Sequence, residues 1–190
     1  MAEERTGAKE RILDTMVQLL TEGKDVNRIT TRRIAEMAEV NTALINYYYQ
    51  SKENLITRAV EVRMESLASK MFERGNTGEA PDIRLKKMVQ AISDFSFENY
   101  VVAEIAIANE LKNGSIYTSQ MILPLLKEIF GEKKSEADLR ILAMQLMTPL
   151  QVMFLNAERY KNFLFVDLFD SKQRNILLDK MVDAIIRQTP

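Results

Sequence analysis

The sequence predicts an all-α protein, and three observations support this fold class. Apolar residues recur at the 3.6-residue spacing of helices along most of the chain. Alternating apolar and polar stretches bounded by turn residues, which would indicate strands, are hard to find. Residues that begin helices precede the periodic segments, as at Thr30, Asn41 and Ser51, and Gly23 follows the first segment as a stop signal.

The periodic segments give the expected order of helices and domains. The first helix carries the apolar stripe of residues 12–20, and the helices that follow begin at Thr30, Asn41 and Ser51. We take the breaker cluster Gly75–Pro81 as the domain boundary. Behind it we expect helices over residues 82–99, 101–113, 115–130, 135–159 and 170–188. The predicted domains are residues 1–50, a connecting helix over 51–72, and residues 73–190.

The composition is that of a globular protein and excludes several kinds of site. Of the 190 residues, 46% are hydrophobic and 28% are charged, which is ordinary for such proteins. The chain has no cysteine and no histidine, so disulfides, the commonest metal ligands and histidine-based catalysis are excluded. We therefore expect no enzyme, no metal and no other cofactor.

Two further features of the sequence bear on partners and location. The short polar N-terminus and the interrupted apolar stretch of residues 141–155 predict neither a targeting segment nor a membrane span, and we expect a cytoplasmic protein. The net charge is -1, and cations and anions balance within the first seventy residues. An interaction with DNA must therefore depend on where the charges lie rather than on their sum.

Residues 30–38 and 41–49 predict two short helices joined by a tight turn, which is the layout of a helix-turn-helix. In that motif the first helix crosses the DNA backbone and the second enters the major groove. Ala35 allows the two helices to approach closely, and Val40 and Ile45 are expected to fill the core beneath them. The far face of the second helix, which is expected to meet DNA, carries Thr42, Ala43, Asn46 and Tyr47.

Helix starts on either side of this motif supply candidate phosphate contacts. Free backbone N–H groups at a helix start bind phosphate, and Thr30, Thr31 and Lys52 add hydroxyl groups and a positive charge at two such starts. Each residue taken alone is better explained as a cap or as a solvated side chain. Their occurrence together in this layout favours DNA binding.

The stretch from Val40 to Leu55, which reads VNTALINYYYQSKENL, resembles the most characteristic segment of the TetR family of bacterial and archaeal regulators. The resemblance runs from Thr30 to Leu55 with the helix before it, about the first third of the chain. It implies an N-terminal three-helix helix-turn-helix domain and a C-terminal helical domain for ligand binding and dimerisation. The function that it implies is a ligand-responsive repressor that binds near-palindromic operator DNA as a homodimer.

The resemblance also assigns roles and reveals departures. It implies base or phosphate contacts for Thr30, Thr31, Arg32, Thr42, Ala43, Leu44, Asn46, Tyr47, Tyr48 and Lys52. Glu39 stands where the family usually has glycine, and in a left-handed conformation it would store about 1 kcal/mol of strain. Asn46 stands where the family often has tyrosine, so it either bonds phosphate or reads adenine. Tyr49 replaces a common phenylalanine and should pack into the core.

The C-terminal half carries candidate effector and dimer residues. Methionine and aromatic side chains there favour a pocket for an apolar or cationic lipophilic molecule, and plain core packing is the alternative. The candidate ligand-binding residues are Phe95, Tyr100, Glu104, Tyr117, Met121 and Met144. Glu104 shares a helical face with Val101 and Ile107, so we expect it to point inward towards a cationic ligand or a partner from a neighbouring helix. In the last helix, the stripe from Ile176 to Ile185 predicts a dimer contact.

Two other classes of protein remain open at this point. A helical DNA-binding protein without an effector would have a solid C-terminal core. An enzyme would need two carboxylates that converge in a cleft, and an adaptor would fail to bind duplex DNA. The sequence identifies neither the operator nor the effector.

Overall fold

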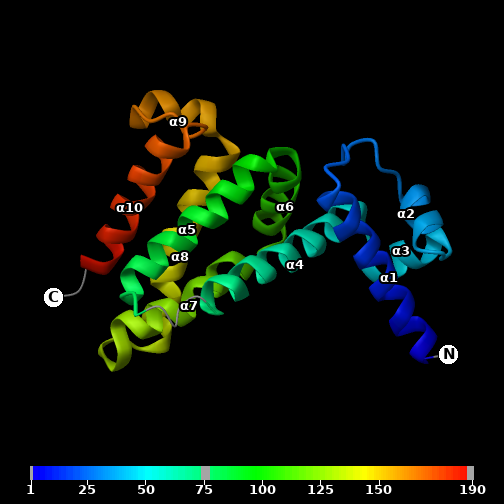
Figure 1. Cartoon of the computed structure of the whole chain (residues 1–190), viewed down its shortest axis with the longest axis horizontal. Coiled ribbons are helices and arrows are strands. Elements are labelled where there is room, and N and C mark those ends of the chain that lie inside the picture. The colour runs from blue at the N-terminus through cyan, green and yellow to red at the C-terminus, as the bar shows by residue number, and fades with distance from the viewer. Residues whose placement is uncertain (1, 74–77, 188–190) are drawn as a thin grey trace. The chain divides into compact units, whose positions relative to one another are not determined.

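The computed structural model describes residues 2–73 and 78–187, and every regular element in these residues is a helix (Figure 1). Residues 75–77 of the predicted breaker cluster and the predicted last residue of the final helix, Gln188, lie outside the described residues. The helices are α1 (Ala2–Thr21), α2 (Thr31–Met37), α3 (Thr42–Tyr49), α4 (Lys52–Glu73), α5 (Pro81–Glu98), α6 (Tyr100–Asn113), α7 (Tyr117–Phe130), the 3-10 turn η2 (Gly131–Lys133), α8 (Glu136–Leu155), α9 (Ala157–Leu164) and α10 (Ser171–Arg187).

The chain divides into two compact units. The first unit contains the chain up to Glu65 together with residues 99–113, and the second contains residues 66–98 and the chain from Gly114 onward. The helix α4 therefore begins in one unit and ends in the other, and α6 belongs to the first unit although both of its neighbours in sequence, α5 and α7, belong to the second. The functional division predicted at residues 50 and 72 stays a prediction.

In the first unit, α1, α2 and α3 pack around a small apolar core. Ile12, Met16, Ile34 and Ile45 are fully buried there, and the burial of such side chains is the main driving force for this packing. Asn109 on α6 bonds two side chains of α4. The amide nitrogen of Asn109 donates to Asn54 Oδ1 and to Thr57 Oγ1, each at 3.0 Å.

In the second unit, α5, α7, α8 and α10 pack side by side. Their buried faces carry large apolar side chains, among them Leu85, Met88, Ile122, Leu126 and Leu146. A polar pair lies within this core, where the amide nitrogen of Gln151 donates to Thr118 Oγ1 at 3.0 Å. Because an unpaired amide in such a place would be costly, this pair fixes how α7 and α8 face each other.

The prediction of one helix over residues 135–159 is wrong at its C-terminal end. A capping box formed by Ser135 and Asp138 begins α8 where the sequence predicts a helix start, but α8 ends at Leu155 and a separate helix, α9, follows. The amide nitrogen of Asn156 donates to the backbone carbonyl of Val152 at 3.0 Å. This side chain satisfies a carbonyl of the last turn, which allows the helix to end where apolar periodicity alone would continue it.

The predicted dimer stripe on the last helix is only partly exposed. Ile176 is 59% exposed, whereas Ile185 is buried in the core of the second unit. Leu177 and Met181 pack against a small cluster formed by Met153, Ala157 and Leu168. A charge at position 185 would therefore destabilise the fold, and the exposed face of α10 lies on the side of Ile176.

Candidate DNA interface

The two short helices of the first unit begin at side-chain caps, as the sequence predicts. Thr30 Oγ1 accepts a hydrogen bond from Arg33 N at 3.1 Å at the start of α2. Asn41 Oδ1 accepts one from Ala43 N at 2.8 Å at the start of α3. Each cap satisfies one of the backbone N–H groups that a helix start leaves free. The remaining N–H groups are available to an anion.

The turn between α2 and α3 is tight and strained. Glu39 has a φ of 53°, which is the left-handed conformation expected if a glycine position is filled by another residue. Val40 N donates to Ala35 O at 3.0 Å and closes the turn, so the backbone retains its hydrogen bonds despite the strain. The strain at Glu39 is about 1 kcal/mol, and the core below the turn must hold it. Val40 is half-buried and contributes less to that core than Ile45, which is fully buried.

Contacts with α1 fix the position of this pair of helices. The phenol of Tyr49, at the end of α3, donates to Lys9 O at 2.9 Å. Arg11 Nε donates to Ala38 O at 3.1 Å, at the end of α2. Tyr49 is buried as predicted, and this burial raises the pKa of its phenol above the usual value. The hydroxyl therefore stays protonated and keeps donating at physiological pH.

The outer face of α3 leaves side chains free to meet a groove. Ala43, Asn46 and Tyr47 are exposed, and Tyr47 is 68% exposed. The Tyr47 ring lies edge-on to the ring of Tyr48, with 5.0 Å between their centroids, and this contact limits the rotamers that Tyr47 adopts. Predicted DNA-binding residues that are half-buried are Thr31, Thr42, Leu44, Tyr48 and Lys52. Each of these side chains is partly packed against the protein and partly exposed, and the packed part fixes its orientation.

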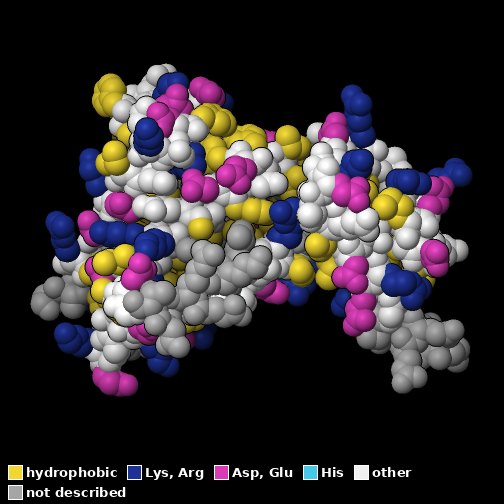
Figure 2. All heavy atoms as spheres, in the orientation of Figure 1, with side chains coloured by type: hydrophobic (Ala, Val, Ile, Leu, Met, Phe, Trp, Pro, Cys, Tyr) yellow, Lys and Arg dark blue, Asp and Glu magenta, His cyan; other side chains and the backbone are white. Residues whose placement is uncertain are grey.

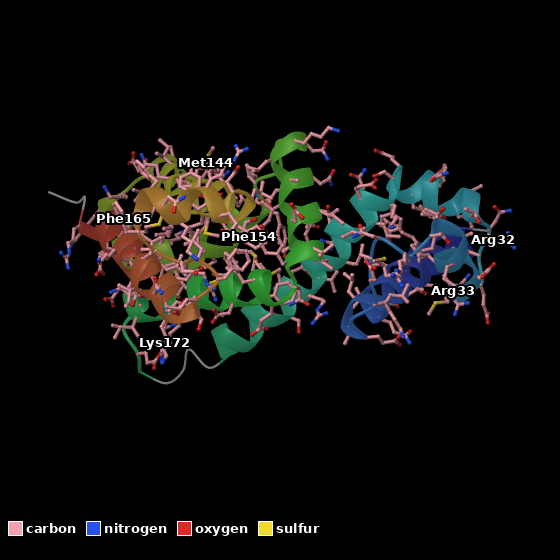
Figure 3. All side chains as sticks on the ribbon, turned by 90° about the horizontal axis from the view of Figure 1, so that it is seen from above. Arg32, Arg33, Met144, Phe154, Phe165 and Lys172 are labelled. Atoms are coloured by element: carbon pink, nitrogen blue, oxygen red, sulfur yellow. The ribbon has the colours of Figure 1, made fainter. Side chains whose placement is uncertain are left out.

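Two arginines on α2 extend from the surface of the first unit (Figure 3). Arg32 pairs with Glu36 at 3.1 Å, and Arg33 lies 3.8 Å from the same carboxylate. Sequence reasoning did not identify Glu36 as a partner, although the spacing of four residues indicates one. Exposed pairs of this kind contribute about 0–1 kcal/mol, so phosphate or a base edge competes readily for Arg32. Figure 2 shows basic and acidic side chains interspersed over this unit, in line with its balanced charge.

Lys52 has a contact that the sequence did not indicate. Its ammonium donates to the backbone carbonyl of Val26 at 2.6 Å, which ties the connection between α1 and α2 to the first residue of α4. Ser51 caps that helix as predicted, because its Oγ accepts from Asn54 N at 3.1 Å. An ammonium has three donors, so Lys52 can bind Val26 and a phosphate at the same time. A backbone acceptor so distant in sequence leaves no signal in residue spacing.

The predicted effector residues lie in both units. Phe95 is buried on α5, and Tyr117 and Met121 are half-buried on α7. Tyr100 is half-buried on α6, in the first unit. Two predictions need correction, because Met144 is 51% exposed on α8 and Glu104 is exposed on α6. Neither side chain is enclosed by the chain.

The error at Glu104 has a physical reason. The face of α6 that is buried carries Ala103, Ala106 and Glu110, whereas Val101, which was expected to share an inward face with Glu104, is exposed. Apolar residues occur on all sides of this helix. The spacing of its apolar residues therefore does not indicate which face is buried. The packing role of its small alanines was underestimated.

Comparisons with known proteins agree with this geometry. Residues 12–59 match the family model of bacterial regulatory proteins of the tetR family. A curated relative, the nucleoid occlusion factor SlmA of Glaesserella parasuis serovar 5 (strain SH0165), is 22% identical over 103 residues, which are 54% of this chain and 51% of the relative. The chain thus aligns with about half the length of that relative. In the described residues, no helix is long and apolar enough to cross a membrane.

Solved structures share the fold over nearly the whole chain. The FadR repressor of Thermus thermophilus, a TetR family protein solved with lauroyl-CoA, has a TM-score of 0.70 at 16% identity and covers 90% of this chain and 92% of its own. A TetR regulator from Rhodococcus sp. RHA1 has a TM-score of 0.69 at 12% identity and covers 98% of this chain and 100% of its own. Residues 12–59 thus match bacterial regulatory proteins of the tetR family, and the chain has the fold of solved TetR family proteins.

Proposed function

We propose that this regulator is a ligand-responsive repressor that binds near-palindromic operator DNA as a homodimer in the cytoplasm. The observation that carries the proposal is the helix-turn-helix of α2 and α3, whose outer face leaves Ala43, Asn46 and Tyr47 exposed on a well-fixed base. Such a face, with capped helix starts beside it, suits a major groove between two phosphate backbones.

The residues of this face divide into two roles in the proposal. Arg32, Thr42, Ala43 and Leu44 contact base edges or a thymine methyl group and so determine sequence preference. The phosphate backbone is gripped by Thr30, Thr31, Asn46, Tyr47, Tyr48 and Lys52, which determine position and salt dependence. Asn46 has a second possible role, because an asparagine side chain also reads adenine.

A homodimer is supported by apolar side chains that the second unit leaves uncovered on α8 and α10. Ile141 and Met144 on α8 are 53% and 51% exposed, and Ile176 on α10 is 59% exposed. Large apolar side chains that gather on adjacent helices favour association. A two-fold axis through this face gives two identical recognition helices, and hence a near-palindromic site.

For the effector we propose an amphiphile with a long apolar chain. The Thermus FadR, which shares the fold, was solved with lauroyl-CoA, and the second unit offers aromatic and methionine side chains such as Phe95 and Met121 on α5 and α7. The case for cationic lipophilic compounds depended on an inward Glu104, and this carboxylate is exposed. Acyl-CoA thioesters are therefore the first compounds to test.

The test begins with selection of bound duplexes from a random pool by the purified full-length protein. We expect an enriched sequence with two-fold symmetry, and recovery of no preferred sequence would contradict operator binding. Lauroyl-CoA is then titrated against the complex with the selected duplex while fluorescence anisotropy follows release. We expect release at micromolar concentration, with free coenzyme A and laurate as controls. Tight, selective DNA binding that a series of acyl-CoA chain lengths leaves unchanged would support the alternative, a DNA-binding protein without this effector.

A further inference from the structure

The helix α3, the proposed recognition helix, ends at a carbonyl that a side chain of the next helix binds. The backbone oxygen of Tyr49, its last residue, accepts from Asn54 Nδ2 at 2.9 Å and from Ser51 N at 2.8 Å. Gln50 follows with a φ of 66°, and its N–H donates to Asn46 O at 3.0 Å. The last carbonyls of a helix have no partner within it, so the bond from Asn54 holds the end of α3 against the start of α4.

The amide of Asn54 is itself held by a side chain of α6. Asn54 Oδ1 accepts from Asn109 Nδ2 at 3.0 Å, and the same nitrogen donates to Thr57 Oγ1, also at 3.0 Å. The helix α6 lies beside the first turns of α4 (Figure 1). Asn109 Oδ1 accepts in turn from Asn113 Nδ2 at 3.1 Å. A line of hydrogen bonds therefore runs from α6 through Asn54 to the last carbonyl of α3.

The ends of this line fix the direction of its bonds. A backbone carbonyl only accepts, so the amide of Asn54 must turn its nitrogen towards Tyr49 O and its oxygen towards Asn109. The hydroxyl of Thr57 donates its single hydrogen to Glu53 O at 2.9 Å, so towards Asn109 it can only accept. Asn109 therefore faces two acceptors, and its NH₂ group has the two hydrogens that they require. An ionised acid of the same shape has none.

Asn109 lies far in sequence from the DNA-binding segment. The family model matches residues 12–59, and α6 begins at Tyr100. The helix nevertheless belongs to the first unit, although α5 and α7 belong to the second. Asn109 and Asn54 are both half-buried, so water replaces a lost partner less readily than it would at an exposed position. Part of the fixed geometry of the first unit is thus supplied from outside the helix-turn-helix.

The end of α3 determines how its outer face meets a groove. Its eight residues extend about 12 Å, so a small rotation at the Tyr49 end moves every side chain of the face. Contacts with base edges are hydrogen bonds that weaken steeply when distance or angle changes. Contacts with phosphate depend largely on charge and tolerate such shifts better. Loss of the bond to Tyr49 O should therefore reduce sequence preference more than overall affinity.

We propose that Asn109 is a positioning residue for the recognition helix, and that it determines how selectively the protein reads its operator by acting through Asn54 on Tyr49 O. It rests on the proposed binding of operator DNA by α3, and it adds a residue of α6 that lies outside the helix-turn-helix. The expected defect is a loss of selectivity, because the side chains that contact phosphate are left in place.

The substitution Asn109→Asp tests this role with little change of shape. Its carboxylate faces the oxygens of Asn54 and Thr57, and the amide of Asn54 can donate to it only by turning over, which removes the donor from Tyr49 O. We expect the affinity for the selected duplex to fall about tenfold, which corresponds to about 1.4 kcal/mol. The affinity for a scrambled duplex should change by less than about twofold. Asn113→Asp, which adds the same charge at an exposed position one turn further along α6, is the matched control and should change neither.

A double-mutant cycle tests whether Asn109 acts through Asn54. Asn54→Ala removes the donor to Tyr49 O, so it should lower the ratio of the two affinities as much as Asn109→Asp does. Once Asn54 is alanine, Asn109→Ala should lower this ratio no further, because the line is already broken. Losses that add up in the double variant would show that Asn109 does not act through Asn54, and would overturn the proposal.

Hydrogen exchange of the free protein tests the positioning without DNA. Peptides that span the end of α3 contain the N–H groups of Gln50 and Ser51, which bond Asn46 O and Tyr49 O. We expect these peptides to exchange faster in Asn109→Asp than in the wild type or in Asn113→Asp, and peptides from residues 12–20 of α1 to stay the same. A general destabilisation would instead lower the urea midpoint and speed exchange in both regions. Asn109→Ala, which adds no charge, repeats the comparison if the aspartate variant does not fold.

The outcomes distinguish this role from operator binding itself. A wild-type protein that prefers no duplex overturns operator binding and the effect on selectivity with it, and faster exchange at the end of α3 would then support only the structural part of the proposal. A selective wild type whose ratio of affinities and exchange are both unchanged by Asn109→Asp overturns the role of Asn109 and leaves operator binding standing. An equal loss on both duplexes also overturns it, because affinity rather than selectivity would have changed.

Discussion

The two units of this protein are built on different kinds of contact. In the first unit, short helices begin at side-chain caps, turn at a strained residue and are fastened to α1 by Arg11 and Tyr49. In the second unit, long helices pack through broad apolar faces, with a few buried polar pairs such as Gln151 with Thr118. The first unit therefore owes its function to local geometry within about fifty residues. The second is shaped instead by which faces of its long helices are buried.

This difference predicts separable defects, and the largest effect should come from the two cores. Ile45 is fully buried in the first unit and Leu146 is buried in the second. Each change to alanine should lower the free energy of unfolding by about 2–5 kcal/mol. We expect Ile45→Ala to abolish binding to the selected duplex while the protein stays dimeric, and Leu146→Ala to weaken the dimer as well. Urea unfolding, ultracentrifugation and DNA binding measured together check this, and identical defects in both variants would show that the units do not act separately.

The same difference explains which features of the fold could be predicted from the sequence. Caps at Thr30, Asn41 and Ser51 were predicted correctly, because each depends on the chemistry of residues within four positions of one another. The number and order of helices followed from periodicity, except at Asn156, where a single side chain ends α8.

What sequence reasoning missed depends on contacts between distant residues. The exposed positions of Glu104 and Met144 depend on which face each helix buries, and a helix that is apolar on all sides does not reveal this. The contact of Lys52 with Val26 O and the pair of Arg174 with Asp94 join residues far apart in sequence. The first contact uses a backbone acceptor, and the second is one of many possible charge pairs. The spacing of residues in the sequence therefore indicates neither contact.

The next largest effect should come from the buried charge of the second unit. Arg174→Ala removes the donor to Leu168 O and leaves Asp94 without its partner. We expect a loss of about 2–4 kcal/mol in the free energy of unfolding, at the lower end because Asp94 is partly exposed. Lys172→Ala, on the exposed side of the same turn, is the control and should cost little. Urea titrations of the wild type and the two variants decide the matter, and equal midpoints for both variants would contradict it.

Smaller effects are expected on the DNA-binding face, and they should differ in kind. Arg32→Ala should cost about 1–3 kcal/mol on the preferred duplex and relax selectivity at one position in each half-site. Lys52→Ala should weaken binding to all duplexes alike and lower the salt slope by about one unit. Because Lys52 also binds Val26 O, a modest loss of thermal stability should accompany this change. Isotherms at several salt concentrations on matched and scrambled duplexes are the measurement. A change of sequence preference with Lys52→Ala and an intact salt slope would reverse the two roles.

The smallest expected effect concerns Glu39, one of three non-glycine residues with a positive φ in the described part of the chain, with a φ of 53°. Glu39 is exposed, and its position in the turn demands a conformation rather than a side chain. Glu39→Gly should therefore raise the free energy of unfolding by about 1 kcal/mol, because glycine adopts this φ without steric cost. Glu39→Ala keeps the strain and is the matched control, for which we expect little gain.

The change at Glu39 should have little effect on function. Glu39→Gly removes a negative charge close to the recognition helix, so DNA binding should stay the same or tighten slightly at low salt. Calorimetric unfolding of the Gly and Ala variants at position 39, beside DNA affinity at two salt concentrations, gives the comparison. A loss of DNA binding in Glu39→Gly at unchanged stability would show that the Glu39 side chain itself takes part in recognition.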